Sequence, residues 1–483
     1  MKKEEDNLKR KTAGGLLWGG MSNGVMQGLS LVFGIVLARL LSQDDYGLVA
    51  MLGVFTALAG CLQEGGFIAA LTNKKEVTRA DYSALFWFSL LVGVLLYIIL
   101  FFAAPLIASY YRSPELIPLS RYVFLGFVLS SLSTMPSAYL FRNLMVRQRS
   151  IGMFVGLLVS GAVGITMACM GYAYWGLATQ SLVYVLVTNV VFWLQTPVRP
   201  FLTIDLRPLR GVLGFSSKMM LTNMANIINL QLLTVIMGRL YNRGDVGFYS
   251  QASKWNAMGY GTLSGMIQSV AQPTLAQVGN DTERRQRVFR KMLRFAAFVS
   301  FPAMWGLALI APELIHIAVG EKWANSIPMM QILCMGAAFV PIITLYTGVV
   351  NSAGRSDLYL RNTLLLGLAQ LVCVLALHPQ GILPMLMGYA TLPAIWLLVW
   401  HCSVRRILEL CVWDAIKDVL PYILASLIAL SGGYLLASLL DSFLLSLLVK
   451  IAVAAGIYAL ILWRMNSVIF METVNYLIRK KKA

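Results

Sequence analysis

The Lys and Arg residues of this chain crowd into every second gap between fourteen apolar stretches. When the N-terminus is placed in the cytoplasm, thirty of the 39 basic residues fall on the cytoplasmic side. Loops rich in Lys and Arg remain cytoplasmic, so the pattern predicts an even number of membrane spans with both termini inside. This topology excludes most soluble functions. The gaps on the other side hold six basic residues, which are Arg39, Arg112, Arg121, Arg239, Arg243 and Lys322.

The composition of the chain also excludes a water-soluble globule. Of its 483 residues, 58% are hydrophobic and 12% are charged, whereas about a quarter of a soluble domain is charged. A helix needs about 20 apolar residues to cross about 30 Å of hydrocarbon, and lipid demands a backbone that satisfies its own hydrogen bonds. We therefore expect an all-α integral membrane protein with about 14 transmembrane helices, although the weak gaps at Tyr172 and Pro379 leave the count open. The expected ranges are 13–40, 46–71, 82–109, 116–140, 150–171, 174–195, 211–238, 246–275, 290–317, 326–351, 358–378, 380–402, 416–440 and 443–463.

Charge and cysteine usage exclude further classes of protein. The net charge of +18 lies mainly on loops that flank the membrane, which favours contact with anionic membrane lipid over nucleic acid. The first apolar run is too long for the core of a signal peptide, so we expect it to remain in the protein. The six cysteines form no CxxC pair and the three histidines lie far apart, so neither disulfides nor a metal or cofactor site is expected. Gaps of at most about 20 residues leave no room for a catalytic domain.

An internal repeat divides the chain. Residues 37–49 (LARLLSQDDYGLV) match residues 237–249 (MGRLYNRGDVGFY) at an offset of 200, and the segments around Pro105 and Pro312 form a second echo. An offset of six helices keeps the same orientation, so it predicts a parallel repeat with a pseudo-two-fold axis along the membrane normal. We expect two six-helix lobes (1–200 and 201–405), two extra helices (406–465) and a basic cytoplasmic tail (466–483). The tail is either an interfacial helix or a frayed end.

Charged residues at membrane depth are costly and usually face a cavity. Lys254 lies eight residues into its helix, about 12 Å from the start, and Lys218 lies a few residues above the cytoplasmic boundary. Both are candidate cavity cations, with helix packing as the alternative for Lys218. Lys450 either has a functional role or extends its side chain to the outer membrane interface. Four residues of the repeat form either an outer gate or hinge, or loop-stabilising ion pairs, and these are Arg39 with Asp45 and Arg239 with Asp245.

Amides and hydroxyls gather in the first helix of each predicted lobe and in the helix at 246–275. In the helix at 211–238, Lys218, Thr222 and Asn226 are spaced four residues apart, which places them on one face. Packing between helices explains some of this polarity, but a water-filled cavity explains more of it. Such a lining suits a sugar that carries phosphate or another acid. The amide candidates for substrate binding are Asn23, Gln27, Asn223, Asn226 and Gln251.

Ordered sequence segments resemble a known family. These are LARLLSQDDYGLVAM, QEGGFIAAL and FWFSLLVGVLLYIILFFAAPLIASYY in the first lobe, with GDVGFYSQASKW and VAQPTLAQVGND in the second. They are similar to the Wzx-type polysaccharide-biosynthesis flippases of the multidrug/oligosaccharidyl-lipid/polysaccharide exporter superfamily. The resemblance implies fourteen helices in a bacterial inner membrane. It also implies transfer of an undecaprenyl-diphosphate-linked oligosaccharide to the periplasm for O-antigen, capsule or exopolysaccharide assembly, ahead of a downstream polymerase or ligase. Cavity cations of this superfamily engage the diphosphate, a role that the resemblance carries to Lys254 and Lys218.

Three alternatives remain beside this hypothesis. The drug-export branch of the superfamily usually carries an acid in the first helix, and residues 13–38 contain neither Asp nor Glu. Lipid II flippases share the fold and differ only in overall likeness. A membrane-bound glycan ligase or polymerase would need a sizeable outer loop. No nucleotide-binding loop is present, so direct use of ATP is not expected. The sequence leaves the driving force open; a proton or sodium gradient is one alternative, with Glu64 as either the coupling acid or an ordinary helix-end charge.

Overall fold

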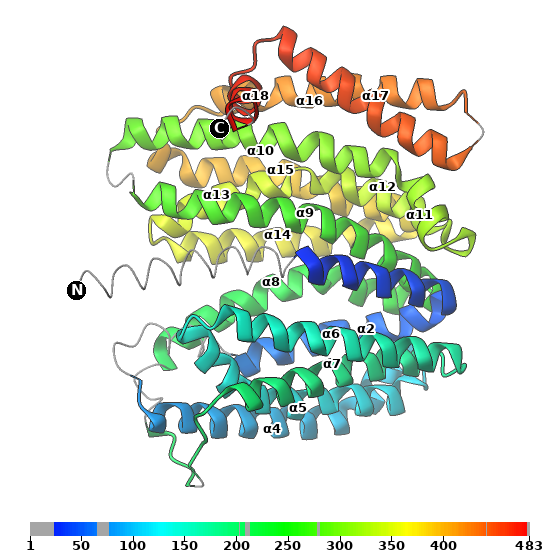
Figure 1. Cartoon of the computed structure of the whole chain (residues 1–483), viewed down its shortest axis with the longest axis vertical. Coiled ribbons are helices and arrows are strands. Elements are labelled where there is room, and N and C mark those ends of the chain that lie inside the picture. Colours follow the sequence, from blue (N-terminus) through cyan, green and yellow to red (C-terminus); the bar gives the residue numbers. More distant parts are fainter. Residues whose placement is uncertain are drawn as a thin grey trace. The chain divides into compact units, whose positions relative to one another are not determined.

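The computed structural model describes residues 24–64, 77–201, 203–207, 213–277, 281–440 and 442–480, and these are almost entirely helical (Figure 1). No strand occurs in these ranges. A helix over Gly24–Leu40 comes first. It is followed by α2 (Gln43–Glu64), α4 (Arg79–Tyr111), α5 (Leu116–Arg142), α6 (Val146–Cys169), α7 (Tyr174–Gln195), α8 (Leu213–Leu240), α9 (Arg243–Gln277), α10 (Thr282–Leu309), α11 (Ala311–Ala318), α12 (Ser326–Ala337), α13 (Val340–Ser352), α14 (Ser356–Leu377), α15 (Ile382–Leu408), α16 (Val412–Ala437), α17 (Phe443–Arg464) and α18 (Val468–Lys480).

Eleven helical segments in the described ranges are long and apolar enough to cross a membrane. One of these runs through α12 and α13 as Ser326–Ser352. The helix over Gly24–Leu40, α8 and α9 are three more long or apolar helices. The arrangement is therefore compatible with fourteen spans, and the expected all-α integral membrane fold is confirmed.

The chain forms two compact units, Met1–Gly247 and Phe248–Ala483. In the first unit α4 packs along α5, α6 along α7, and α8 along α2. In the second unit α10 packs against α12 and α16, and α14 packs against α15. The lobe boundaries at residues 200 and 405 remain a prediction.

Small residues let neighbouring helices approach closely in the first unit. On α6, a Cβ added to Gly152 would lie 2.5 Å from the Phe192 ring, and one added to Gly164 would lie 3.0 Å from Gln180. Both contacts are with α7, so a larger side chain at either position would push the two helices apart. Close approach of this kind is a main source of helix association in lipid, where no hydrophobic force draws helices together.

One expectation for the later helices needs correction. The single helix expected at 290–317 is wrong: α10 begins at Thr282, where the Asp281 side chain caps it, and it ends at Leu309 before the separate helix α11. The basic cluster at 284–294 is therefore helical. Of the two alternatives for the tail, the helical one is found, because α18 spans Val468–Lys480. Figure 1 shows α18 nearly end-on, whereas α10, α16 and α17 run across the picture.

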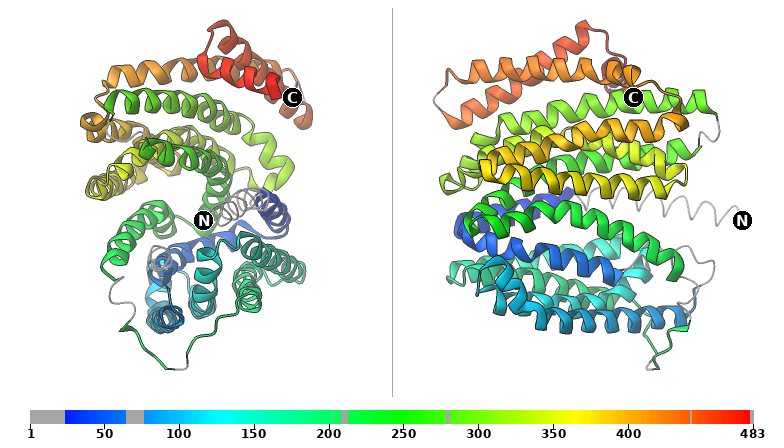
Figure 2. Two further views of the ribbon diagram at one scale, coloured as in Figure 1. Left: turned by 60° about the vertical axis from the view of Figure 1, so that its left-hand side comes forward. Right: turned by 180° about the vertical axis from the view of Figure 1, so that it is seen from behind.

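The α16–α17 hairpin is held to the rest of the second unit by a buried carboxylate near each end. Both views of Figure 2 show the orange and red hairpin beside α10, against which α16 packs. Asp418 of α16 accepts hydrogen bonds from Arg290 at 2.6 Å and from Arg294 at 2.7 Å. At the other end Lys450 of α17 lies 2.6 Å from Glu313 of α11.

The environment of Lys450 corrects the expectation that it snorkels to the outer interface. Its side chain is 8% exposed, and its Nζ also donates to the Leu309 carbonyl at 3.2 Å. Ser446 donates to the same Glu313 oxygen at 2.9 Å. The sequence argument failed because the partner lies far away along the chain, in α11.

Candidate functional site

A cluster of polar groups lies on α9 in the second unit, around Lys254. Gln251 is 2% exposed and Asn256 is 7% exposed. Within the described part of the chain, Gln251 Oε1, Trp255 Nε1 and Asn256 Oδ1 have no hydrogen-bond partner. A buried polar group left unpaired costs about 1–3 kcal/mol. These side chains therefore need water or a ligand to complete their hydrogen bonds.

Lys254 is the cation of this cluster. Gln251, Lys254 and Trp255 are spaced three and four residues apart, so they share one face of α9. The Lys254 side chain is partly buried, and no ion pair or hydrogen bond to another described residue reaches its Nζ. A partly buried cation on the same helix face as the unpaired Gln251 oxygen can bind an anionic or strongly polar group.

The amide candidates of the first unit lie on α8 and on the helix over Gly24–Leu40. Asn223 and Gln27 are exposed, and Asn226 is half-buried and makes contacts of its own. Gln231 of α8 approaches Gly53 of α2, where an added Cβ would lie 3.8 Å from its Oε1. The remaining candidates, Asn23 and the side chains of Lys218 and Glu64, lie outside the described residues.

The two copies of the repeat motif touch each other in the first unit. A Cβ on Gly47 would lie 2.8 Å from the Arg243 carbonyl carbon, and a Cβ on Gly247 would lie 2.7 Å from that of Gln43. Residues 43 and 243, like 47 and 247, are related by the offset of 200. Each glycine therefore packs on the backbone of the other copy, which is the reciprocal contact of a local two-fold arrangement. We call this contact the glycine clasp.

Both copies of the motif also begin their helix in the same way. The Asp45 amide donates to the Ser42 hydroxyl at 3.2 Å, directly before α2. The Asp245 amide donates to the Asn242 side chain at 2.8 Å, directly before α9. Ser and Asn are both preferred N-cap residues. The sequence comparison missed this pair because residues 42 and 242 differ in type, although the cap signal three residues before each Asp was present.

The motif side chains bind backbone and loop groups, and for Arg239 and Asp245 these contacts stand in place of the ion pair expected as one alternative. Asp45 accepts a hydrogen bond from the Tyr174 amide at 3.0 Å. Arg239 donates to the Tyr110 carbonyl at 2.6 Å, and Asp245 receives no hydrogen bond from it. These contacts anchor the clasp to the ends of α4 and α7. The roles of Arg39, Asp45, Arg239 and Asp245 as gate or hinge remain a prediction.

Arg243 adds an ion pair to the clasp. Its guanidinium lies 2.6 Å from the Glu115 carboxylate and donates to the Ser113 hydroxyl at 3.2 Å. A backbone hydrogen bond, and then the bond from Arg243, hold the pKa of Glu115 below its usual range. Sequence analysis missed Glu115, since it lies in a different loop from its partner.

We expect replacement of Glu115 by glutamine to destabilise the protein by less than about 1 kcal/mol, because the pair is partly exposed. A carboxylate with a lowered folded pKa stabilises the fold above its unfolded pKa, and this contribution is lost as the pH falls through the folded pKa. The difference between wild type and Glu115→Gln should therefore shrink as the pH falls from about 5 to about 3. Thermal unfolding in detergent across this range measures it, and a constant difference would contradict the assignment.

Replacement of Gly47 by alanine should weaken the clasp. The added methyl overlaps the Arg243 backbone, which cannot rotate away as a side chain can. Such overpacking typically costs about 1–3 kcal/mol. The free energy of unfolding in detergent micelles tests this, with Gly60→Ala on the same helix as the control, because nothing lies within 4 Å of a Cβ there. Equal stability of the two variants would contradict the close contact.

Solved structures with the same fold define the class of the protein. The lipid II flippase MurJ, in an inward closed conformation, superposes with a TM-score of 0.73 at 15% identity, covering 93% of this chain and 99% of MurJ. An inward-facing multidrug transporter of the MATE family superposes with a TM-score of 0.64 at 15% identity, covering 80% and 94%. The chain thus has the fold of these multi-pass membrane transporters.

Sequence comparison supplies the family. Residues 36–328 match the model of the polysaccharide biosynthesis protein family, and the chain belongs to it. The lipopolysaccharide biosynthesis protein WzxC of Escherichia coli K12 is 27% identical over 337 residues, which cover 68% of this chain and 67% of WzxC. The teichuronic acid biosynthesis protein TuaB of Bacillus subtilis is 22% identical over 359 residues, 73% of each chain. The resemblance found in the sequence is confirmed.

Proposed function

We propose that the protein flips a polyprenyl-diphosphate-linked oligosaccharide, expected to be carried on undecaprenyl, from the cytoplasmic to the periplasmic leaflet of a bacterial inner membrane. The observation that carries the proposal is the α9 cluster, in which the buried Gln251, whose Oε1 is unpaired in the described part of the chain, shares a helix face with the partly buried Lys254. Family membership and relatives named for polysaccharide biosynthesis support it. The glycan would then enter O-antigen, capsule or exopolysaccharide assembly through a downstream polymerase or ligase.

The chemistry of the cluster fits the head of such a lipid. A diphosphate carries negative charge that Lys254 can neutralise, and the sugar hydroxyls can complete the hydrogen bonds of Gln251 and Asn256. A charged group in a site of low dielectric interacts more strongly than in water, so a single cation contributes much of the selectivity. Lys218, Asn223, Asn226, Asn23 and Gln27 are proposed as further contacts of the head group.

The glycine clasp suggests how access alternates. The clasp joins the two repeat copies at the first turns of α2 and α9, which the charge pattern predicts to be periplasmic. In the proposed cycle this contact would be closed while the substrate enters from the cytoplasmic side, and its opening would release the sugar outward. Backbone-to-glycine contacts suit this task, because they form and break without the transfer of a charge into lipid. The cycle would draw on an ion gradient, with Glu64 as the candidate acid.

A lipid II-type flippase is the second candidate, since MurJ shares the fold over most of the chain. The two candidates differ in substrate, so cells that lack the gene separate them. The proposal expects undecaprenyl-linked oligosaccharide to accumulate on the cytoplasmic side and to clear when the wild-type gene is restored. Accumulation of lipid II would favour the second candidate, and drug sensitivity without either lipid would favour export.

A further inference from the structure

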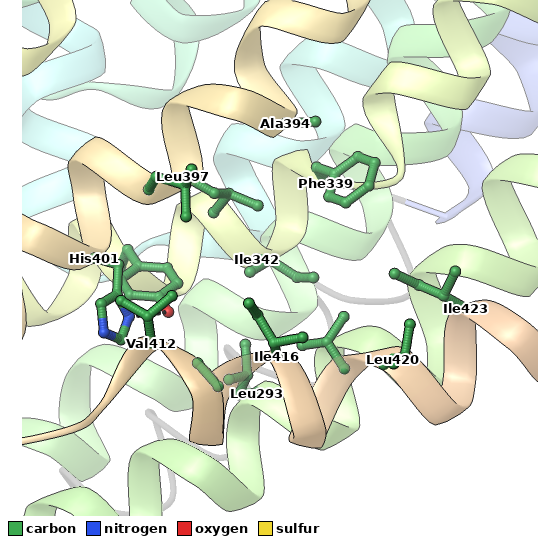
Figure 3. Close-up of a pocket in the computed structure, with 14 residues that line it drawn as sticks. Leu293, Phe339, Ile342, Ala394, Leu397, His401, Val412, Ile416, Leu420 and Ile423 are labelled. Atoms are coloured by element: carbon green, nitrogen blue, oxygen red, sulfur yellow. Dashed lines mark hydrogen bonds between the residues drawn. The ribbon is translucent and has the colours of Figure 1, made fainter.

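A lateral cavity lies in the second unit between α10, α13, α15 and α16 (Figure 3). Its volume is about 190 Å³ and its lining is almost wholly apolar. Leu398 of α15 and Ile416 and Leu420 of α16 line it and remain exposed. Exposed apolar side chains on a membrane-spanning helix face lipid, so the cavity opens towards the hydrocarbon.

The polar groups of the cavity are already satisfied. The Tyr346 hydroxyl lies 3.0 Å from His401 Nδ1, and His401 Nε2 lies 3.1 Å from the Leu410 carbonyl. Figure 3 shows His401 beside Val412 at one end of the cavity. A polar ligand would gain no free partner from this pair, so the occupant of the cavity itself must be a hydrocarbon chain.

The length of the cavity fits a chain of one membrane leaflet. Its lining on α16 extends from Val412 to Ile423, which corresponds to about 17 Å at 1.5 Å per residue. This is close to half of the hydrocarbon thickness of about 30 Å. A phospholipid acyl chain has this reach, whereas the polyprenyl chain of a sugar carrier is far longer.

Two basic residues flank the end of the cavity where α15 ends and α16 begins. Arg405 lies four residues beyond His401 and therefore on the same face of α15. Lys417 adjoins the cavity residue Ile416, and its Nζ lies 6.0 Å from the ring of the exposed Trp413. Both side chains are exposed, and neither forms an ion pair with a described carboxylate. Tryptophan and basic residues are typical of the membrane interface.

The other charges at this end leave a positive balance. Asp418 is shared by Arg290 and Arg294, so the three groups together keep one positive charge. Glu409 caps the end of α15 and Asp414 lies in the first turn of α16. These two acidic residues offset two of the three positive charges, which are those of the Asp418 cluster, Arg405 and Lys417. The wider end also carries the exposed basic residues Arg284, Arg287 and Arg464 and the exposed acidic residues Asp281 and Glu283, and these five leave one further positive charge.

We propose that a phospholipid with an anionic head group binds here, with one acyl chain in the cavity and its phosphate held by Arg405 and Lys417. The lipid comes from the leaflet predicted to be cytoplasmic, where anionic lipids attract basic residues near the surface. It fills the gap beside α16, a helix that is otherwise held to this unit by α10 and by its partner α17. The site is separate from the α9 cluster and does not depend on the transport substrate.

Native mass spectrometry of the full-length protein with added phosphatidylglycerol tests the head-group contact. Each basic residue near an anionic surface strengthens binding about fivefold. The double variant Arg405→Gln/Lys417→Gln should therefore bind the first phosphatidylglycerol about 30-fold more weakly than wild type. The control Arg207→Gln/Arg361→Gln removes the same charge from exposed positions away from this end of the cavity, and it should stay within twofold.

The acyl-chain contact needs its own variants. Leu420→Trp places a large side chain in the cavity. Ala394→Leu adds a smaller side chain from α15 and narrows the cavity from that side. Both should weaken binding of phosphatidylglycerol, with folding checked by circular dichroism and gel filtration.

Three results would overturn the proposal. These are equal affinity of the wild type for phosphatidylcholine and phosphatidylglycerol, wild-type affinity in the double variant, and displacement of phosphatidylglycerol by equimolar polyprenyl phosphate. The last result would make the sugar carrier the occupant.

Discussion

Replacement of Lys254 by methionine is expected to lower the rate of lipid-linked oligosaccharide transfer by about 100-fold. Truncating one partner of a buried charge interaction costs about 2–5 kcal/mol, and every 1.4 kcal/mol corresponds to a factor of about ten. Methionine keeps the length and the apolar part of the side chain, so the loss reports on the charge. Lys254→Arg keeps the charge and should retain part of the activity. Initial transfer rates in proteoliposomes measure the effect.

The matched control is Lys291→Met. Lys291 is 61% exposed and pairs with Glu472 of α18, so its replacement removes the same charge away from α9. Transfer should stay within about twofold of wild type, since an exposed pair contributes less than about 1 kcal/mol. Lys254 makes no ion pair with a described residue, so Lys254→Met should unfold at nearly the wild-type temperature. Full transport by Lys254→Met, or a loss matched by the Lys291 variant, would contradict the proposed cationic site.

Replacement of Lys450 by methionine is expected to destabilise the protein by about 3–5 kcal/mol, the usual cost of leaving one buried charge unpaired. The Glu313 carboxylate would keep only the Ser446 hydroxyl, and its Oε2 already has no partner in the described part of the chain. The affected contact joins α17 to α11. The free energy of unfolding in mixed micelles measures this cost.

The double variant Glu313→Leu/Lys450→Met separates pairing from packing. It removes both charges together, and well-packed apolar residues often replace a buried pair at little cost. Most of the stability lost in Lys450→Met should therefore return. Destabilisation below about 1 kcal/mol in the single variant, or no recovery in the double variant, would show that the pair contributes little to the docking of α17.

Local sequence patterns were sufficient to predict the fold class and most helix bounds. A helix that crosses lipid needs a long apolar run. For this reason α5 and α7 begin at the residues that the hydropathy pattern predicts. The repeat was also visible locally, because Gly47 and Gly247 are conspicuous in matching segments. The sequence alone did not reveal that each glycine touches the backbone of the other copy, because this contact forms only in the folded chain.

Long-range polar contacts could not be predicted from the sequence. Glu313 and Lys450 are 137 residues apart, and Asp418 and Arg290 are 128 apart. Nothing in the local pattern of either helix indicates which charge will meet which. Lys254 was identifiable because its depth follows from helix length alone, whereas the buried state of its neighbour Gln251 depends on tertiary packing.

Transfer by the purified protein in liposomes tests the central claim most directly. The liposomes carry a polyprenyl-diphosphate-linked oligosaccharide in both leaflets, and an impermeant glycosidase is added outside. The account predicts that nearly all of the glycan becomes cleavable with the wild-type protein, and about half with protein-free liposomes or with Lys254→Met at early times. Cleavage that stops at about half with the wild-type protein would contradict the flippase assignment.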